Sequence, residues 1–241
     1  MNGHAETGAS GKSFIFGIGS GRSGTLSLAN VLNNQTGTFV THEFRAFNED
    51  RSLTRPHRVP IPWETSKNEL DEAISAVAAY PYTRVGDVAS FWLPHLPYVF
   101  TLGAPVRVVV LWRARNEVVE SFEKHVGDKN HWMKHDGKKW RLEPNWDRAF
   151  PKMEAATRAE AIGKYWDLYY DMANELALGF PDSVRIWPVN VLNDRRGLRE
   201  MLEFVGIPRK NQRLSVALHR NRSQRTLIGF IRGARRRILR Y

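Results

Sequence analysis

A glycine-rich stretch with the sequence FGIGSGRSGT occupies residues 16–25, directly after a short apolar run. Glycine lets the backbone approach a ligand closely, and the N–H groups of a turn that opens a helix donate to anions. The Arg22 guanidinium adds a positive charge whose planar fork suits oxyanions. An ordinary strand-to-helix turn is the alternative. We expect an anion cradle, formed by seven consecutive residues: Gly19, Ser20, Gly21, Arg22, Ser23, Gly24 and Thr25.

The cradle departs from two familiar nucleotide-binding patterns. The dinucleotide pattern G-x-G-x-x-G fails because its last position is Arg22, and the Walker pattern would need glycine at Phe16 and lysine at Arg22. A P-loop nucleotidase also needs an acidic group at a strand end to hold Mg²⁺. The strongest apolar run, VRVVVLW, is followed by Arg113, which leaves Asp87 as the alternative. This favours transfer of a group that needs little help from a metal, such as a sulfuryl group.

The elements that must position the cradle alternate along the chain. Apolar runs predict strands over 13–18, 36–43, 83–87, 106–112 and 183–189, and helical periodicity covers 25–34, 66–80, 116–125, 157–178 and 197–207. Such alternation predicts an α/β fold, a single domain whose central parallel β-sheet is flanked by helices. We expect strand 36–43 to lie next to strand 13–18.

Composition and charge indicate the bounds of the domain, the compartment and the class of partner. Residues 1–12 are small and polar and predict a disordered leader, residues 13–225 the α/β domain, and residues 226–241 a basic C-terminal helix. The chain has no cysteine, which excludes disulfides and thiolate metal sites. No secretory signal or membrane-spanning run is visible, so we expect a cytoplasmic protein. The net charge of +11 favours anionic partners.

Two stretches together resemble the sulfotransferases that use 3′-phosphoadenosine 5′-phosphosulfate (PAPS). FIFGIGSGRSGTLSL looks like the family's 5′-phosphosulfate loop, and VVVLWRARNEVVESF is similar to its second motif. In that motif an Arg at a strand end and a Ser eight residues later grip the 3′-phosphate, and Arg113 and Ser121 stand at this spacing. The stretch VRIWPVNVLND…LREMLEFVGIP is a weaker likeness. The resemblance implies a P-loop-containing sulfotransferase-like fold, PAPS as donor, adenosine 3′,5′-bisphosphate (PAP) as its product, and no metal.

The chain also departs from the family. Many relatives have Lys in place of Arg22, and the usual Arg-Asp-Pro is Arg113-Ala114-Arg115 here. The basic C-terminal loop of the cytosolic animal relatives is missing, and Arg220, in RNRSQR, is the candidate to replace it at the 3′-phosphate. Without the first loop, Arg113 would be read as a partner of Glu117 and Ser121 as a solvated helix position.

Sulfuryl transfer to an alcohol needs a base near the attacking oxygen. The resemblance implies a His or Glu after the second strand, which makes His42 and Glu43 the candidates. Since side chains alternate along a strand, only one of the two is expected to face the site, and His42 is slightly favoured. Asp87 ends another strand and is expected to orient the acceptor or the base. The alternatives are a surface His–Glu pair and, for Asp87, a helix N-cap.

The acceptor itself is not specified by any motif. Residues 126–150 combine Trp132, Trp140 and Trp146 with His and Lys, which suits a sugar, aromatic or anionic acceptor, although a disordered surface loop is the alternative. We expect transfer to a hydroxyl or amine of a small molecule or carbohydrate. Two other functions stay open: a small-molecule kinase using ATP and Mg²⁺, and a nucleic-acid or membrane-surface binder driven by the basic tail.

Overall fold

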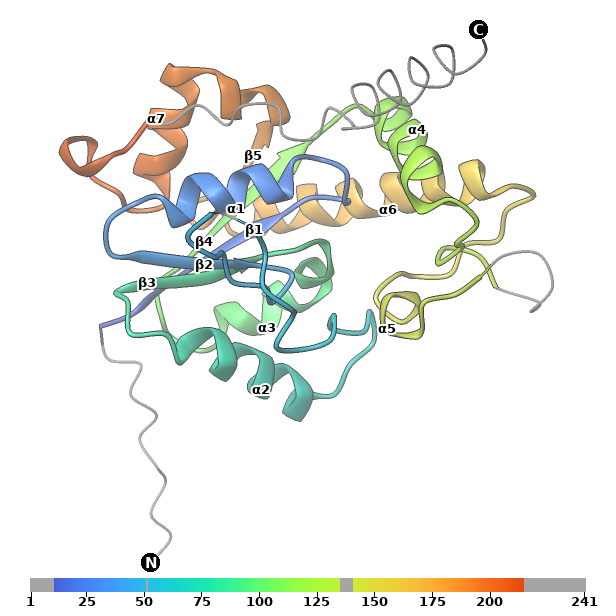
Figure 1. The fold of residues 1–241 in the computed structure, drawn as a ribbon, viewed down its shortest axis with the longest axis horizontal. Helices are drawn as coiled ribbons and strands as arrows, with labels where there is room; N and C mark the ends of the chain where they lie inside the picture. The colour runs from blue at the N-terminus through green and yellow to red at the C-terminus, as the bar shows by residue number, and fades with distance from the viewer. Residues whose placement is uncertain (1–10, 51, 135–140, 215–241) are drawn as a thin grey trace, which may run out of the picture.

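The central layer of the protein is a sheet of parallel strands, seen in a computed structural model that describes residues 11–50, 52–134 and 141–214 (Figure 1). The strands are β1 (Ser13–Ile18), β2 (Thr38–His42), β3 (Arg84–Val88), β4 (Val106–Trp112) and β5 (Val184–Pro188). Their order across the sheet is β2-β3-β1-β4-β5, and every neighbouring pair is parallel. The predicted fold class, one α/β domain with a central parallel sheet, is therefore confirmed.

The expectation that β2 lies next to β1 is wrong, because β3 lies between them. The long connection from β2 passes through a helix and returns β3 to the position beside β1. In β3, Gly86 lies opposite Ile15 of β1 and opposite Val40 of β2. A Cβ at Gly86 would collide with the carbonyl oxygen of Ile15, so this glycine lets the two strands approach closely.

Helices cover both faces of the sheet, as parallel sheets require. The helices are α1 (Thr25–Asn33), α2 (Lys67–Ala78), α3 (Leu96–Phe100), α4 (Arg115–Val126), α5 (Pro144–Asp147), α6 (Arg158–Gly179) and α7 (Arg195–Phe204). Short 3₁₀ helices occupy Ser90–His95, Val189–Asn193 and Arg209–Asn211. The buried residues of α1 and α7 pack on one face of the sheet, and those of α2, α3, α4 and α6 belong to the cluster on the other face.

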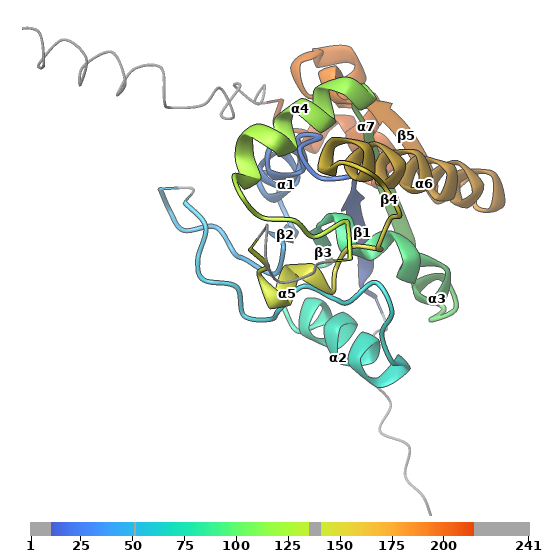
Figure 2. The same cartoon turned by 90° about the vertical axis from the view of Figure 1, so that its right-hand side faces the viewer.

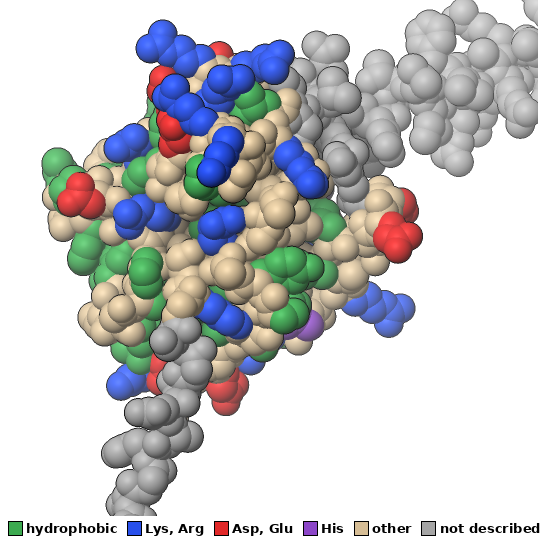
Figure 3. Space-filling model, turned by 90° about the vertical axis from the view of Figure 1, so that its left-hand side faces the viewer, with side chains coloured by type: hydrophobic (Ala, Val, Ile, Leu, Met, Phe, Trp, Pro, Cys, Tyr) green, Lys and Arg blue, Asp and Glu red, His purple; other side chains and the backbone are tan. Residues whose placement is uncertain are grey.

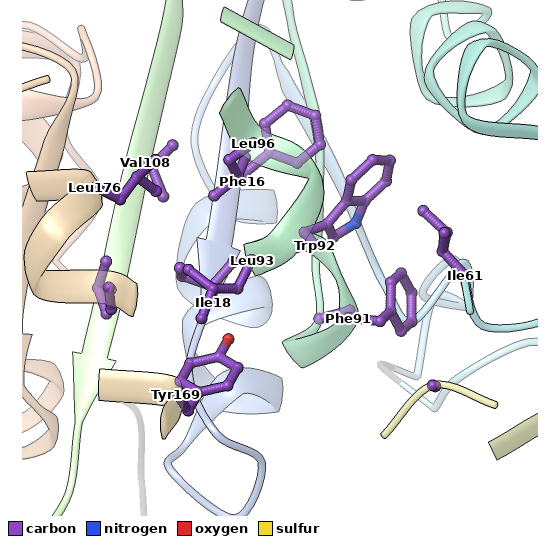
Figure 4. Packing of buried hydrophobic residues seen from close by; sticks show 14 of the residues in the cluster. Phe16, Ile18, Ile61, Phe91, Trp92, Leu93, Leu96, Val108, Tyr169 and Leu176 are labelled. Carbon is purple, nitrogen blue, oxygen red and sulfur yellow. The ribbon is translucent and has the colours of Figure 1, made fainter. Parts of the chain in front are cut away.

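The alternation of side chains along β1 divides the core into these two clusters. Phe14, Phe16 and Ile18 face the cluster that contains α6 and the 3₁₀ helix of Ser90–His95, whereas Ile15 faces α1 and α7. Figure 4 shows the first cluster, where Phe16 packs on Trp92 with ring centroids 4.6 Å apart. Because both faces of β1 are buried, the strand reads as a continuous apolar run that ends at the glycine-rich loop.

Local signals explain where two of the helices begin. Ser66 caps α2 with a complete capping box to Glu69, and Thr157 caps α6 by accepting a hydrogen bond from the N–H of Glu160. The short helices α3 and α5 have no side-chain cap, and the helical periodicity in the sequence does not cover them.

The two ends of the strands present different surfaces. Figure 2 looks onto the side where the glycine-rich loop, α4 and α5 gather, and Figure 3 shows the opposite face, where Lys and Arg side chains are spread with apolar and acidic ones among them. No helix in the part of the chain that the structure describes is both long and apolar enough to cross a membrane. Most of the predicted leader, Arg220 and the predicted basic C-terminal helix lie outside the described residues.

Candidate active site

The glycine-rich loop follows β1 at the carboxyl edge of the sheet and leads directly into α1. Its backbone uses the left-handed region at Gly21 (φ +84°), at Arg22 (φ +53°) and at Gly24 (φ +90°). Glycine adopts such angles without a steric penalty, but arginine does so only at a cost. A Cβ at Gly21 would also lie 2.7 Å from the ring of Phe122. The glycines thus permit a tight loop that larger residues could not form.

The start of α1 is suited to holding an anion. Gly24 is the N-cap and provides no side-chain acceptor, so the first-turn N–H groups have no side-chain cap. The Ser23 hydroxyl is buried, and no hydrogen-bond partner for it lies within bonding distance among the described residues, although the Tyr170 hydroxyl lies near it. An uncapped helix terminus beside a buried, unpaired hydroxyl fits a bound phosphate or sulfate group. The residues of the cradle therefore fit the 5′-phosphosulfate end of PAPS.

Arg113 and Ser121 come from a different part of the chain and meet the cradle. Arg113 follows β4, and its Nη1 donates to the carbonyl oxygen of Arg22 at 2.8 Å. Ser121 lies in the second turn of α4, where its hydroxyl accepts a hydrogen bond from Nε of Arg22 at 3.1 Å. The alternative pairing of Arg113 with Glu117 is also present at 2.8 Å. The Arg113 guanidinium therefore contacts both Arg22 and Glu117. Ser121 is bonded to the cradle and is not merely a solvated helix residue.

A cavity of about 310 Å³ opens beside the cradle. Gly21, Arg22, Gly24 and Thr25 form one side of it. The other lining residues include several from α4 and from the segment that follows it: Phe122, His125, Val126, Lys129, His131, Trp132, Glu143, Trp146 and Phe150. The cavity thus joins an anion-binding loop to a largely aromatic wall.

Glu43 lines this cavity, whereas His42 is not among the lining residues. His42 is the last residue of β2 and is 7% exposed, with its Nε2 3.2 Å from the Thr25 hydroxyl. Glu43 lies one residue beyond the strand, and its φ of +54° turns the chain there. Only one of the pair faces the cavity, and a left-handed turn brings Glu43 to that position.

The protonation of the two side chains follows from their surroundings. Burial, with a smaller contribution from Arg45, lowers the pKa of His42 to about 4, so its imidazole is neutral at neutral pH. Burial and, after it, the nearby Asp87 raise the pKa of Glu43 to about 7, against the opposing charges of Arg45 and Arg22. A carboxylate that titrates near neutrality can take up a proton during a reaction at physiological pH.

Asp87 is fully buried at the end of β3 and is not among the residues that line the cavity. Its Oδ1 accepts hydrogen bonds from the Thr41 hydroxyl at 2.6 Å and from the N–H of Phe44 at 3.1 Å. Its Oδ2 accepts one from Nε1 of Trp92 at 2.8 Å. The Asp87 carboxylate therefore binds the Trp92 side chain of the next 3₁₀ helix and does not cap the N–H groups at the start of that helix. Both of its oxygens already accept hydrogen bonds.

The aromatic segment 126–150, predicted to suit an acceptor or to be a disordered surface loop, lines the cavity in its described parts. Trp132 is fully buried and packs against Phe122 with ring centroids 4.8 Å apart, and half-buried Trp146 lines the cavity. Lys129 and Glu143, which also line it, form an ion pair. Trp140 lies outside the described residues.

Other residues of the site carry no motif and were not predicted. Tyr169 in α6 accepts a hydrogen bond from the N–H of Gly19 at 3.1 Å and donates one to the carbonyl oxygen of Ser90 at 3.1 Å. Tyr170 donates to the carbonyl oxygen of Leu111 at 2.6 Å. The one available signal was a pair of tyrosines within an apolar helical pattern, since buried tyrosine needs a partner for its hydroxyl.

Comparison with known proteins adds little to this geometry. No protein-family model and no curated protein matches the chain. The crystal structure of a sulfotransferase from Alicyclobacillus acidocaldarius is similar, with a TM-score of 0.49 and 15% sequence identity over 90% of each chain. A likeness this distant carries no argument about function, which has to come from the site itself.

Proposed function

We propose that this protein is a sulfotransferase that moves a sulfuryl group from PAPS to a hydroxyl or amine of a small-molecule or carbohydrate acceptor. The observation that carries the proposal is the convergence of Arg113 and Ser121 on Arg22 in the cradle. A nucleotide with phosphate groups on both its 5′ and 3′ sides needs two neighbouring anion sites. The cradle would take the 5′-phosphosulfate, and Arg113 with Ser121 would take the 3′-phosphate, as the resemblance of the two motifs implies.

In this proposal, bound PAPS supplies an activated sulfuryl group whose sulfur–oxygen bond to the 5′-phosphate breaks while a bond to the acceptor oxygen forms. Arg22 offsets the negative charge that develops on the leaving phosphate. Glu43 faces the same cavity and takes the proton that the acceptor hydroxyl loses. The aromatic wall at Phe122, Trp132 and Trp146 holds the body of the acceptor.

The structure gives the kinase alternative less support. A kinase of this type needs a carboxylate that can reach Mg²⁺, and Asp87 was the candidate at a strand end. Its two oxygens already accept hydrogen bonds from Thr41, Phe44 and Trp92, and it does not line the cavity. The nucleic-acid or membrane alternative depends on the tail, which lies outside the described residues.

The test compares two nucleotides by thermal unfolding. PAP at a hundred times its Kd should stabilise the protein by about 2.7 kcal/mol, which is a rise of roughly 5–10 °C for a domain of this size. ATP with Mg²⁺ should give a much smaller rise. The reverse order would contradict the proposal and favour a kinase.

Arg22→Ala tests the cradle directly. The variant should keep the fold and lose nearly all transfer from PAPS to a panel of phenols, alcohols and sugars, because it lacks the charge beside the leaving phosphate. Arg58→Ala is the control, since Arg58 is an arginine outside this cavity whose contact is a surface pair with Glu72 at 3.4 Å. Full activity in a folded Arg22→Ala protein would overturn the assignment of the loop.

A further inference from the structure

The backbone beside the cavity has an unusual conformation at Glu43 and Phe44. Glu43 and Phe44 have φ angles of +54° and +58°, in the left-handed region that side-chain-bearing residues rarely occupy. Two such residues in succession persist only when the surrounding structure holds them in place. The turn directs Glu43 into the cavity, while Phe44 is fully buried in the core.

Asp87 connects the parts of the chain that meet at this turn. Its Oδ1 accepts from the N–H of Phe44 within the turn and from the hydroxyl of Thr41 in β2. Its Oδ2 accepts from Trp92 in the 3₁₀ helix that follows β3. Hydrogen bonds to a buried carboxylate are stronger than those between neutral groups, so this residue can offset the cost of the left-handed turn.

We propose that Asp87 is a positioning residue, whose buried carboxylate holds the turn at Glu43 and Phe44 and so keeps the Glu43 side chain in the cavity. The inference rests on the proposed function, in which Glu43 takes the proton of the acceptor. Asp87 does not line the cavity, so it acts through Glu43 and not on the reacting atoms.

Full burial raises the pKa of Asp87 itself, its three hydrogen bonds favour the ionised form, and the charge of that form acts on Glu43. After burial, it is the main cause that raises the pKa of Glu43 to about 7. The groups that face these two carboxyls come from several elements: Arg22, His42 and Arg45 face Glu43, and His57 and Tyr80 face Asp87. One residue thus contributes both to the direction of the Glu43 side chain and to its raised pKa.

The first measurement needs no acceptor: the carboxyl carbon of Glu43 is titrated by NMR, and hydrogen exchange of the Phe44 N–H is followed. In the unmodified chain Glu43 should titrate near 7. In Asp87→Asn its pKa should fall by about one unit, because burial remains as the largest cause of the raised value, and the Phe44 N–H should exchange faster, because a strong acceptor is lost. Trp92→Phe, which removes the donor to Oδ2, should change both in the same direction by less.

Tyr170→Phe is the matched control, since it removes a buried hydrogen bond beside the cradle without touching the turn. It should leave the titration of Glu43 unchanged. The proposal is overturned if Glu43 titrates near 4.5 in the unmodified chain. It is equally overturned if folded Asp87→Asn, or folded Trp92→Phe where the first variant does not fold, leaves both the titration and the Phe44 exchange unchanged.

Nucleotide binding separates this inference from the proposed function. PAP should bind Asp87→Asn within about twofold of the unmodified chain, because Asp87 lies away from the cradle, while turnover with an acceptor should fall about 10- to 100-fold with an unchanged KM for the donor. Failure of PAP to bind the unmodified chain would contradict the sulfotransferase proposal, whereas the titration would still decide the role of Asp87 in holding Glu43.

Discussion

Replacing Arg113 by alanine should weaken the 3′-phosphorylated nucleotide selectively. Its guanidinium reaches the carbonyl oxygen of Arg22 through Nη1 and Glu117 through Nε, so it is held at the edge of the cradle with donors left over. In the proposed complex, these donors would bind the 3′-phosphate. The 5′-phosphate belongs to the cradle, so its contacts should survive the change.

The expected size follows from the kind of bond that is lost. A hydrogen bond to a charged group contributes about 1.5–3 kcal/mol, which is roughly a 10- to 150-fold change in affinity. The side chain of Arg113 is half-buried and paired with Glu117, so solvent and that ion pair reduce the effect, and we expect the lower half of this range. The Arg113→Ala protein should therefore bind PAP about 10- to 30-fold more weakly.

Isothermal titration calorimetry with PAP and with adenosine 5′-monophosphate measures this difference. The second nucleotide lacks the 3′-phosphate, so its Kd should change by less than about threefold. Arg115→Ala is the control, because Arg115 lies only two residues further along, at the start of α4, but pairs with Asp167 at 2.9 Å and does not line the cavity. Equal weakening of both nucleotides, or the same loss in Arg115→Ala, would refute the reasoning.

Two further changes test the base and the sheet. Glu43→Gln should lower kcat by about 10²–10⁴ with little change in PAP binding. Because only the ionised carboxylate of Glu43 accepts a proton, the activity of the unmodified enzyme should rise as the pH increases through about 7, and the variant should lose this rise. A rise that persists in the variant would place the base elsewhere. Gly86→Ala should destabilise the fold by about 1–3 kcal/mol, since the added Cβ meets the carbonyl oxygen of Ile15 in the adjacent strand. Gly179→Ala, where a Cβ meets no atom within 4 Å among the described residues, should leave the unfolding temperature nearly unchanged, and equal loss in both would refute this account.

Most of the fold could be predicted because the strands of a covered parallel sheet leave a strong pattern. The runs at 13–18 and 106–112 correspond to β1 and β4 residue for residue, since both strands are buried on two faces and are apolar except at Ser13 and Arg107. The order of the strands could not be predicted in the same way. Gly86 allows the close approach of β3 to β1, and this role is visible only from the strand beside it.

The site, like the fold, has a part that the sequence predicts and a part that it does not. The cradle was predictable because its glycines, Arg22 and hydroxyls are consecutive, and Arg113 and Ser121 keep a fixed spacing. The choice between His42 and Glu43 was not, because alternation along a strand stops at His42 and the next residue adopts a left-handed conformation. The contact from Tyr169 to Gly19 joins residues 150 positions apart and leaves no local pattern.

Unfavourable backbone angles and closely spaced like charges occur beside the cavity. Within the part of the chain that the structure describes, the non-glycine residues with positive φ are Arg22, Glu43 and Phe44, and the first two line the cavity. The guanidinium of Arg22 is also placed near Arg113, and burial together with that like charge lowers its pKa. An anion in the cradle would relieve this repulsion, so the free energy spent on holding two arginines together would be recovered when the donor binds. Strained backbone and crowded charge are expected where a protein is shaped for a ligand and not for stability alone, and here both occur between the cradle and Glu43.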